Sequence, residues 1–149
     1  MTKILIKRLF KNVQIPKYET EGSSGLDLAA KLDKDVNINP GEVEIIPTGL
    51  AVSIPKGFEI QIRPRSGLAA KNKISVLNTP GTIDSDYRGE LKVILINLGQ
   101  KKFKVENGLR IAQMVLCPII HAKLEEVDEL KDTERGEGGF GSTGTKWYK

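Results

Sequence analysis

Short apolar runs alternate with turn-forming residues along most of the chain, and this pattern predicts β-strands rather than helices. Residues 58–63 show it most clearly, because the apolar Phe58, Ile60 and Ile62 are separated by polar residues and should face inward together. Strands are predicted at residues 3–9, 26–30, 36–38, 43–46, 50–54, 58–63, 75–77, 82–83, 91–96, 103–106 and 109–120. Regular spacing of short strands and turns is typical of an all-β sandwich or barrel.

One segment departs from the strand pattern. Residues 66–71, with the sequence SGLAAK, favour a short helix, and Ser66 is predicted to be its N-cap. The start of a helix exposes backbone N–H groups that suit phosphate oxygens. Arg65 adds a planar cation beside them, and Gly67 allows close approach to the backbone. The alternative is a capped surface turn whose charged side chains are only solvated.

Two predicted strands carry apolar residues on both faces, residues 91–96 and 109–120. Such strands must be covered on both sides, by the core on one side and by another subunit on the other. Gln113 is an uncharged polar residue within the second strand. It is either a buried amide satisfied by its neighbours or a donor to a ligand phosphate.

The segment 76–99 carries the most conspicuous polar groups. A turn at 78–81 leads into a short returning run and then a second turn at 85–89. Asp84 and Asp86 are two residues apart, so on an extended backbone they point the same way, and Tyr87 follows them. A carboxylate beside a bend is often only a turn former, and that interpretation stays open here.

Composition narrows the class of protein. A chain of 149 residues, 39% hydrophobic and 28% charged, is one domain of ordinary size, and 5% aromatic residues imply an aliphatic core. The net charge of +4 suits an anionic ligand but is too small to indicate nucleic-acid binding, so no nucleic-acid partner is expected. The chain has one cysteine and one histidine, which excludes a disulfide within the chain and makes a zinc site improbable.

Targeting signals are not evident. Residues 1–11 alternate apolar and basic side chains and lack the apolar core of a signal peptide. No apolar run approaches the length needed to span a membrane. A cytoplasmic protein with no membrane partner is therefore expected.

The C-terminal residues differ from the rest of the chain. Five of the fifteen glycines fall within residues 131–149, where aliphatic residues are few. Such a segment cannot pack a core, so we expect a β-barrel catalytic domain at 1–130 followed by a flexible glycine-rich arm at 131–149. Arg135 and Phe140 have no structural reason to be there, and the GSTG run at 141–144 could cradle an anion. The alternative is a disordered tail.

Five segments, in chain order, resemble the signature motifs of the trimeric dUTP pyrophosphatases, the dUTPases. They are GLDL at 25–28, PRSGLAAK at 64–71, GTIDSDYRGELKV at 81–93, GLRIAQM at 108–114 and RGEGGFGSTG at 135–144. The resemblance covers nearly the whole chain. It implies a jelly-roll-like β-barrel, with one short helix, that assembles as a homotrimer with active sites shared between subunits.

The resemblance also implies an activity, the hydrolysis of dUTP to dUMP and pyrophosphate with Mg²⁺ as cofactor. Asp84 would orient and deprotonate the water that attacks the α-phosphorus, and Asp27 would hold the Mg²⁺ through its waters. From the residues alone, Asp27 is either a carboxylate at a strand edge or turn, which is the commoner case, or one that faces a hydrated cation.

Substrate-binding residues follow from the same resemblance. The phosphates would be bound by Arg65, Ser66, Gly67, Gln113, Arg135, Gly141, Ser142 and Thr143. Asn78 and the backbone through Gly81, Thr82 and Ile83 would read uracil. Tyr87 would pack on the deoxyribose and exclude a 2′-hydroxyl, and Phe140 from another subunit's arm would stack on the base.

Two alternatives remain at this stage. One is a dCTP deaminase on the same fold, which the hydrolase-type hairpin and the glycine-rich fifth motif disfavour. The other is a non-catalytic jelly-roll module that binds nucleotides or assembles as a shell. That module would leave Arg135 and Phe140 unexplained.

Overall fold

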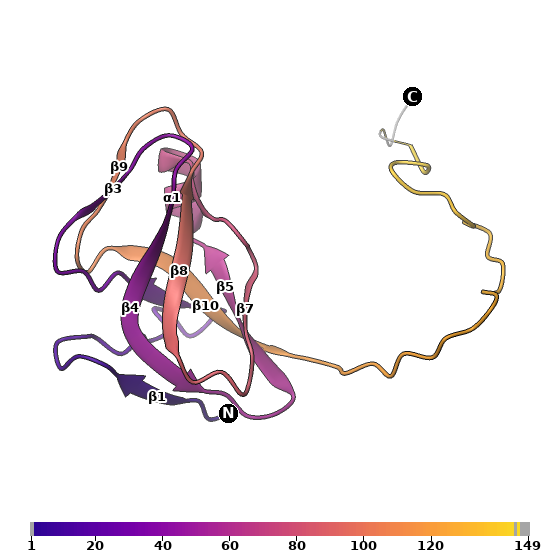
Figure 1. Ribbon diagram of the computed structural model, residues 1–149, viewed down its shortest axis with the longest axis horizontal. Coiled ribbons are helices and arrows are strands. Elements are labelled where there is room, and N and C mark those ends of the chain that lie inside the picture. The colour runs from indigo at the N-terminus through magenta and orange to yellow at the C-terminus, as the bar shows by residue number, and fades with distance from the viewer. Residues whose placement is uncertain (1, 145, 147–149) are drawn as a thin grey trace.

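The computed structural model describes residues 2–144 and 146, and within them the chain forms ten strands and one short helix (Figure 1). The elements are β1 (Leu5–Arg8), β2 (Leu26–Ala29), β3 (Val36–Ile38), β4 (Val43–Ser53), β5 (Phe58–Pro64), α1 (Ser66–Asn72), β6 (Ile74–Val76), β7 (Gly81–Ile83), β8 (Glu90–Asn97), β9 (Phe103–Val105) and β10 (Arg110–Pro118). The predicted all-β class with one short helix is confirmed.

The strands form two four-stranded sheets and one small sheet. One sheet has the order β1-β4-β8-β6 and the other has the order β2-β10-β5-β7, while β3 and β9 form the two-stranded sheet. All the pairings are antiparallel. Residues far apart in the sequence are neighbours in this topology, since β2 pairs with β10 and β4 with β8.

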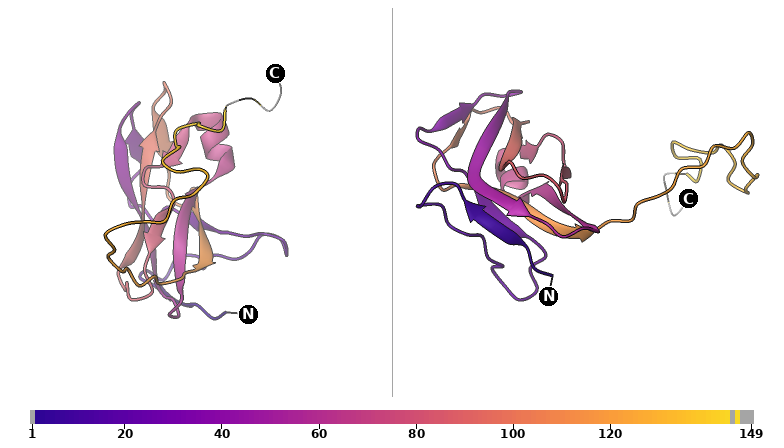
Figure 2. Two further views of the ribbon diagram at one scale, coloured as in Figure 1. Left: turned by 90° about the vertical axis from the view of Figure 1, so that its right-hand side faces the viewer. Right: turned by 60° about the horizontal axis from the view of Figure 1, so that its bottom comes forward.

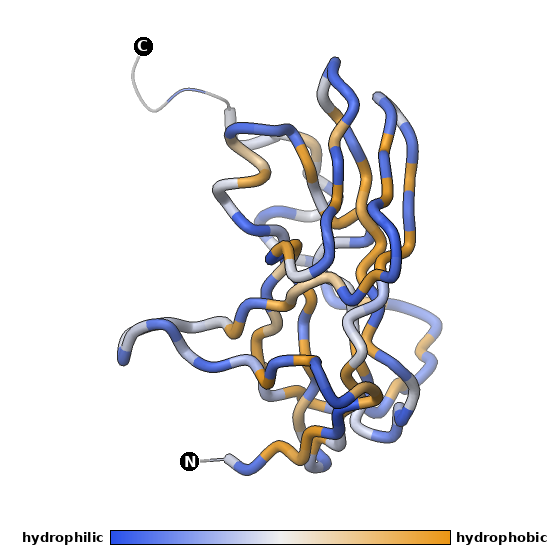
Figure 3. The backbone as a smooth tube through the Cα atoms, turned by 90° about the vertical axis from the view of Figure 1, so that its left-hand side faces the viewer, coloured by the Kyte–Doolittle hydropathy of each residue, from blue (hydrophilic) through white to orange (hydrophobic). Residues whose placement is uncertain are grey.

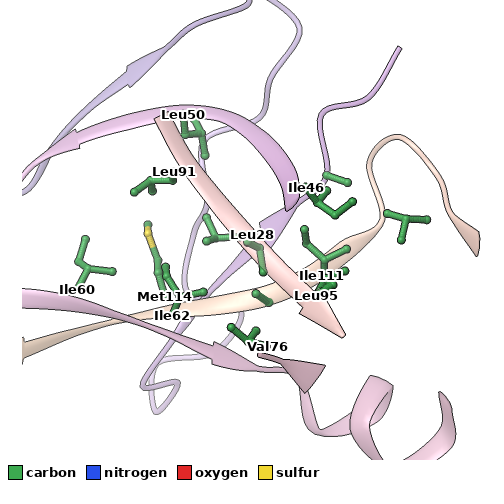
Figure 4. Close-up of a cluster of buried hydrophobic side chains, with 14 of the residues drawn as sticks. Leu28, Ile46, Leu50, Ile60, Ile62, Val76, Leu91, Leu95, Ile111 and Met114 are labelled. Atoms are coloured by element: carbon green, nitrogen blue, oxygen red, sulfur yellow. The ribbon is translucent and has the colours of Figure 1, made fainter. Parts of the chain in front are cut away.

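Aliphatic side chains fill the space between the two larger sheets (Figure 4). β4 and β8 contribute Ile46, Leu91 and Leu95, and β5 and β10 contribute Ile62 and Met114, each at most 3% exposed. Burial of such a side chain contributes about 1.5–3 kcal/mol. Hydrophobic residues follow the strands, and hydrophilic residues gather at the loops that project from them (Figure 3).

The predicted break between strands 43–46 and 50–54 is wrong, because β4 runs without interruption from Val43 to Ser53. The turn-forming residues Pro47, Thr48 and Gly49 produce a shift in the pairing with β8 rather than a turn. The Thr48 hydroxyl donates to the Leu91 carbonyl at 2.7 Å, and the Gly49 N–H donates to the Glu90 carboxylate at 2.8 Å. These tertiary hydrogen bonds hold the segment within β4, with Gly49 at a left-handed φ of 70° where the pairing shifts.

The outer surface of the first sheet carries the apolar positions predicted to need a second cover. On β8 the inward Leu91, Val93 and Leu95 are buried and the residues between them are not. Ile94 and Ile96 are half-buried and pair across the sheet with the exposed Ile45 and Val43 of β4. We call this surface the outer apolar face, and its residues are Val43, Ile45, Leu77, Ile94 and Ile96.

After β10 the chain leaves the body and extends away from it (Figure 1; Figure 2, right). The segment 120–137 is exposed at every residue. Within the predicted arm, residues 145 and 147–149 lie outside the described residues. The helix α1 has seven residues, and no helix in the described part of the chain has the length and apolar character needed to cross a bilayer.

The small β3–β9 sheet carries exposed ion pairs. Lys104 contacts Glu106 at 2.6 Å and Asp35 at 3.0 Å. Hydrogen bonds to Glu106 and then Asp35 raise the pKa of Lys104 to about 12. Both pairs are solvated, so their contribution to stability is small.

Asn97 joins this small sheet to β8 and is fully buried. Its amide nitrogen donates to the carbonyls of Ile38 and Lys101, both at 2.8 Å, and its amide oxygen accepts from the Gly99 N–H at 2.9 Å. One side chain therefore satisfies three backbone groups where the chain turns out of β8.

Asn97→Ala should lower the free energy of unfolding by about 2–4 kcal/mol, because it leaves those backbone groups without their partner. Urea unfolding at a fixed protein concentration measures the change. The matched control is Asn37→Ala at an exposed position of β3, which should change the value by about 0.5 kcal/mol or less. Equal stabilities for Asn97→Ala and the wild type would contradict this role.

Candidate functional site

Asp27 lies at the centre of a charged cluster on the outer surface of the second sheet. It is directly opposite Gln113 on β10, which is opposite Arg63 on β5. The Arg65 Nε donates to Asp27 Oδ1 at 3.0 Å, and the Arg110 Nη1 donates to Asp27 Oδ2 at 3.0 Å. Each oxygen of the carboxylate, which is 19% exposed, therefore has its own guanidinium partner.

Arg110 is the residue of this cluster that sequence reasoning missed. Its side chain pairs with Asp27, and its backbone carbonyl accepts from Arg65 Nη1 at 3.3 Å. It therefore orders both the carboxylate and the neighbouring cation. The local signal was a charged residue at the start of an otherwise apolar strand. That signal does not identify a partner that lies 83 positions away in the sequence.

Gln113 is held in place within the same cluster. Its Nε2 donates to the Pro64 carbonyl at 3.0 Å, and the residue is half-buried. A side chain at Gly25 would collide with the Gln113 amide oxygen, so the amide lies against bare backbone. The amide nitrogen therefore has a backbone partner, and a phosphate-binding role for this residue stays a prediction.

The helix α1 begins directly after β5 beside this cluster. The predicted N-cap, Ser66, is wrong by one residue: Arg65 occupies the cap position with extended dihedrals, and no side chain caps the helix. β5 ends at Pro64, and Arg65 alone joins it to the helix in an extended conformation, so Ser66 is already helical. Ser66 and Gly67 are both exposed at the first turn, where backbone N–H groups have no partner inside the helix.

We call residues 76–83 the hairpin, although the prediction of two paired strands is wrong: β6 pairs with β8, and β7 pairs with β5 in the other sheet. This turn lines a separate, small pocket of about 40 Å³. Asn78, Gly81, Thr82 and Ile83 all contribute to its wall. Gly81 is buried, and a Cβ atom placed on it would lie 3.1 Å from the Asn78 side-chain nitrogen. The peptide bond between Thr79 and Pro80, at the tip, is cis. These contacts make a tight turn with little free volume inside it.

Asp84 follows β7 immediately and is exposed. Its carbonyl accepts from the Tyr87 N–H at 3.2 Å, which closes the turn that carries both side chains. The Tyr87 hydroxyl donates to the Glu90 carbonyl at 3.0 Å, and the residue is 43% exposed. The acid and the ring therefore lie on one short loop at the end of the hairpin.

The predicted arm residues form a series of turns away from the body (Figure 2, right). The Arg135 Nε donates to the Gly138 carbonyl at 2.7 Å, so this cation is locally hydrogen-bonded. Phe140 has a left-handed φ of 47° and is fully exposed. Gly141, Ser142 and Thr143 are exposed in the following turn. The described residues give this aromatic ring no packing partner of its own.

The predicted site residues thus fall into three separate places on one chain. Asp27 and Asp84 lie on opposite edges of the sheet β2-β10-β5-β7, three strand spacings apart. They are also offset along the strands, because Asp27 is level with Arg63 whereas Ile83 is level with Ile60. At ~4.8 Å per strand and ~3.3 Å per residue, the strand spacings and the offset together give a separation of roughly 20 Å.

A metal site made by this chain alone is not evident. Among the described residues, no three His, Cys, Asp or Glu side chains come close enough to share a metal ion. Asp27 and Arg110 also line a larger groove of about 850 Å³, together with the basic Arg8, Lys11 and Lys31. Glu19 also lines this groove and lies 3.6 Å from Arg110 Nη1, but the basic residues of the groove outnumber its two carboxylates, which suits an anionic ligand.

Comparison with known proteins identifies the family of the chain. The dUTPase family model matches residues 11–144. The deoxyuridine 5′-triphosphate nucleotidohydrolase of Brucella melitensis is 58% identical over 137 residues, covering 91% of this chain and 87% of that protein. The protein of the same name from Gloeothece citriformis is 56% identical over 142 residues, covering 95% and 97%.

A solved structure agrees with these relatives. The dUTPase of Staphylococcus bacteriophage 80alpha with dUPNHPP superimposes with a TM-score of 0.87 at 29% identity, covering 97% of this chain and all of that one. The match includes the hairpin, the charged cluster and most of the arm, since it extends over nearly the whole chain.

Proposed function

The chain belongs to the dUTPase family, and on this premise we propose that it hydrolyses dUTP to dUMP and pyrophosphate, which lowers dUTP and supplies dUMP for thymidylate synthesis. The observation that carries the proposal is the position of Asp84, an exposed carboxylate one residue beyond the strand that lines the hairpin pocket. The residues that recognise the base are thereby next to the residue that activates water, within one loop.

The hairpin selects uracil. Asn78 and the backbone of Gly81, Thr82 and Ile83 present N–H and C=O groups to the pyrimidine edge. The small volume of the pocket and the close contact between Gly81 and Asn78 support a turn too tight for the methyl group of thymine. Tyr87 packs on the deoxyribose and excludes a 2′-hydroxyl.

Asp84 acts as the general base. It accepts a proton from a water molecule whose oxygen attacks the α-phosphorus, and the bond to the bridging oxygen breaks as pyrophosphate leaves. No covalent intermediate is needed, because phosphoryl transfer asks mainly for positioning and neutralisation of charge. Asp84 is exposed and directly follows β7, whose backbone is held by pairing with β5, and this placement supports the role.

The phosphate-binding groups are those of the charged cluster and the first turn of α1. Arg65 uses two of its five N–H donors on Asp27 and Arg110, which orients the rest of the guanidinium. Ser66 and Gly67 offer a hydroxyl and backbone N–H groups on the exposed turn. Gln113 lies opposite Asp27 and completes the set.

Asp27 fits a hydrated Mg²⁺ ion rather than a caged one. Its carboxylate already accepts two charged hydrogen bonds, and no cluster of three metal-binding side chains occurs in the described residues. Mg²⁺ keeps several of its waters and relies on substrate phosphates for its other ligands, so one carboxylate contacting those waters is sufficient. When bound, the ion would neutralise part of the charge of the triphosphate.

The functional unit is a homotrimer in which the sites are shared between subunits. Asp84 and Asp27 must both lie near the α- and β-phosphates of one substrate, and roughly 20 Å separates them on one chain. The outer apolar face supports assembly, because Val43, Ile45 and Leu77 are exposed there. Copies of the chain would cover this face and bring the two acids together.

Residues 131–149 act as a mobile arm that follows the catalytic domain at 1–130. Phe140 from one subunit stacks on the base bound by another, and Arg135 reaches the γ-phosphate. Gly141, Ser142 and Thr143 add phosphate contacts. The exposure of the Phe140 ring supports this, since an aromatic side chain among glycines has nothing in its own segment to pack against.

Asp84→Asn should lower kcat by about 10²-fold or more, because the attacking water loses its base. Steady-state release of pyrophosphate from dUTP with Mg²⁺ measures this, and binding of dUPNHPP should stay close to the wild-type value. The control is Asp86→Asn in the same exposed turn, which should retain activity within about twofold. Full activity of Asp84→Asn would overturn the assignment.

Sharing of the sites predicts complementation between two inactive variants. Random trimers of Asp84→Asn and Arg65→Gln chains, prepared by co-refolding, should recover about a quarter of the wild-type activity, because a site that takes the two residues from different chains is intact in that fraction. Co-refolding of Asp84→Asn with Asp84→Ala is the control and should recover none. Mixed trimers verified by mass spectrometry but without activity would contradict sharing between chains.

Deletion of residues 131–149 should leave the fold intact, because the described residues of this segment contribute no buried side chain. It should lower kcat/KM for dUTP by about 10²-fold, since closure over the substrate is lost. Thermal unfolding and light scattering control for stability and assembly. A truncated protein that hydrolyses dUTP at the wild-type rate would show that the arm has no catalytic part.

A further inference from the structure

The Tyr87 ring folds back over the backbone of its own loop. Its hydroxyl donates to the Glu90 carbonyl at 3.0 Å, three residues further along the chain. A Cβ atom placed on Gly89 would collide with the hydroxyl oxygen and with the ring carbon that carries it. The ring therefore occupies the space that any side chain at position 89 would need.

The carbonyl that receives the Tyr87 hydroxyl is itself fixed. Glu90 opens β8 and pairs with Ala51 on β4. Its carboxylate accepts from the Gly49 N–H at 2.8 Å, so both its backbone and its side chain are tied to β4. The hydroxyl end of the tyrosine is thereby anchored to the sheet while much of the residue stays exposed.

The backbone does not explain the glycine at position 89. Seven described glycines have a left-handed φ that favours glycine, and Gly89 is not among them. A residue with a side chain could adopt the same backbone conformation. The Tyr87 side chain is what excludes it.

We propose that Gly89 is a positioning residue that sets the orientation of the Tyr87 ring, and through it the discrimination between 2′-deoxyribose and ribose. The inference rests on the proposed function, in which this ring packs on the sugar. A bare backbone at position 89 lets the ring lie flat against the loop, with its hydroxyl on Glu90. A methyl group there lifts the ring and changes the space left at the sugar 2′ carbon.

The expected effect is one on selectivity rather than on folding. The colliding atoms belong to the far end of a partly exposed side chain, which can rotate away without disturbing the sheet. Gly89→Ala should therefore keep its melting temperature within about 2 °C of the wild type. The ratio of kcat/KM for dUTP to that for UTP should fall by about tenfold, with most of the change in KM for dUTP.

Gly22→Ala is the matched control. Nothing lies within 4 Å of a Cβ atom at Gly22, and its φ is not left-handed. It should leave both the dUTP/UTP ratio and the melting temperature unchanged. Tyr87→Phe removes the hydroxyl that is nearest to the added methyl group, so Gly89→Ala should have a smaller effect in that background than in the wild type.

A crystal structure of Gly89→Ala gives a readout that does not depend on turnover. The ring should be rotated away from Glu90, and the hydrogen bond to the Glu90 carbonyl should be lost. A wild-type ring orientation, or a wild-type dUTP/UTP ratio despite a rotated ring, would overturn the proposal. Failure of the wild-type protein to hydrolyse dUTP would instead refute the proposed function, and the ring orientation would still decide whether Gly89 positions it.

Discussion

The packing of aliphatic side chains between the two larger sheets determines where the polar groups can lie. Leu28 on β2 and Met114 on β10 face the core. Because side chains alternate along a strand, Asp27 and Gln113 must then face outward, and the pairing register places them directly opposite each other. A slip of one residue in β10 would turn its core residues to solvent and Gln113 inward, so the core also holds the charged cluster in register.

The same sheet imposes a separation that a single chain cannot overcome. Asp27 lies on one edge strand and Asp84 directly follows the other, and β10 and β5 lie between them. Neither acid can move toward the other without breaking strand pairing. A site that uses both acids on one triphosphate must combine surfaces of different copies, which agrees with the outer apolar face and with an arm that extends from the body (Figure 1). In the proposed enzyme, assembly is therefore part of the catalytic chemistry.

The local pattern of apolar and polar residues predicted the structure correctly where the conformation depends on residues nearby in the chain. Alternation placed Ile60 and Ile62 inward, and the compact segment after Arg65 formed the predicted helix. The errors arose where distant partners intervene. The sequence predicted a turn at Thr48 and Gly49, but hydrogen bonds to Leu91 and Glu90 hold these residues within β4. Ser66 was predicted as the N-cap, but the helix starts one residue earlier than that prediction implies, with the extended Arg65 between β5 and α1 at the cap position.

The sequence by itself determined most of the strands, their inward faces, the turn at 78–81 and the segments that resemble the dUTPase motifs, because each depends on residues within a few positions of one another. Only the tertiary structure decided which strands are neighbours. That choice brings Arg110 onto Asp27 from 83 positions away and gives Asn97 the carbonyl of Ile38 from 59 positions away. The same holds for the ring of Tyr87 over Gly89, where proximity in sequence did not reveal the direction of the side chain. These contacts depend on how the sheets pack and how side chains rotate, which the local periodicity of apolar residues does not encode.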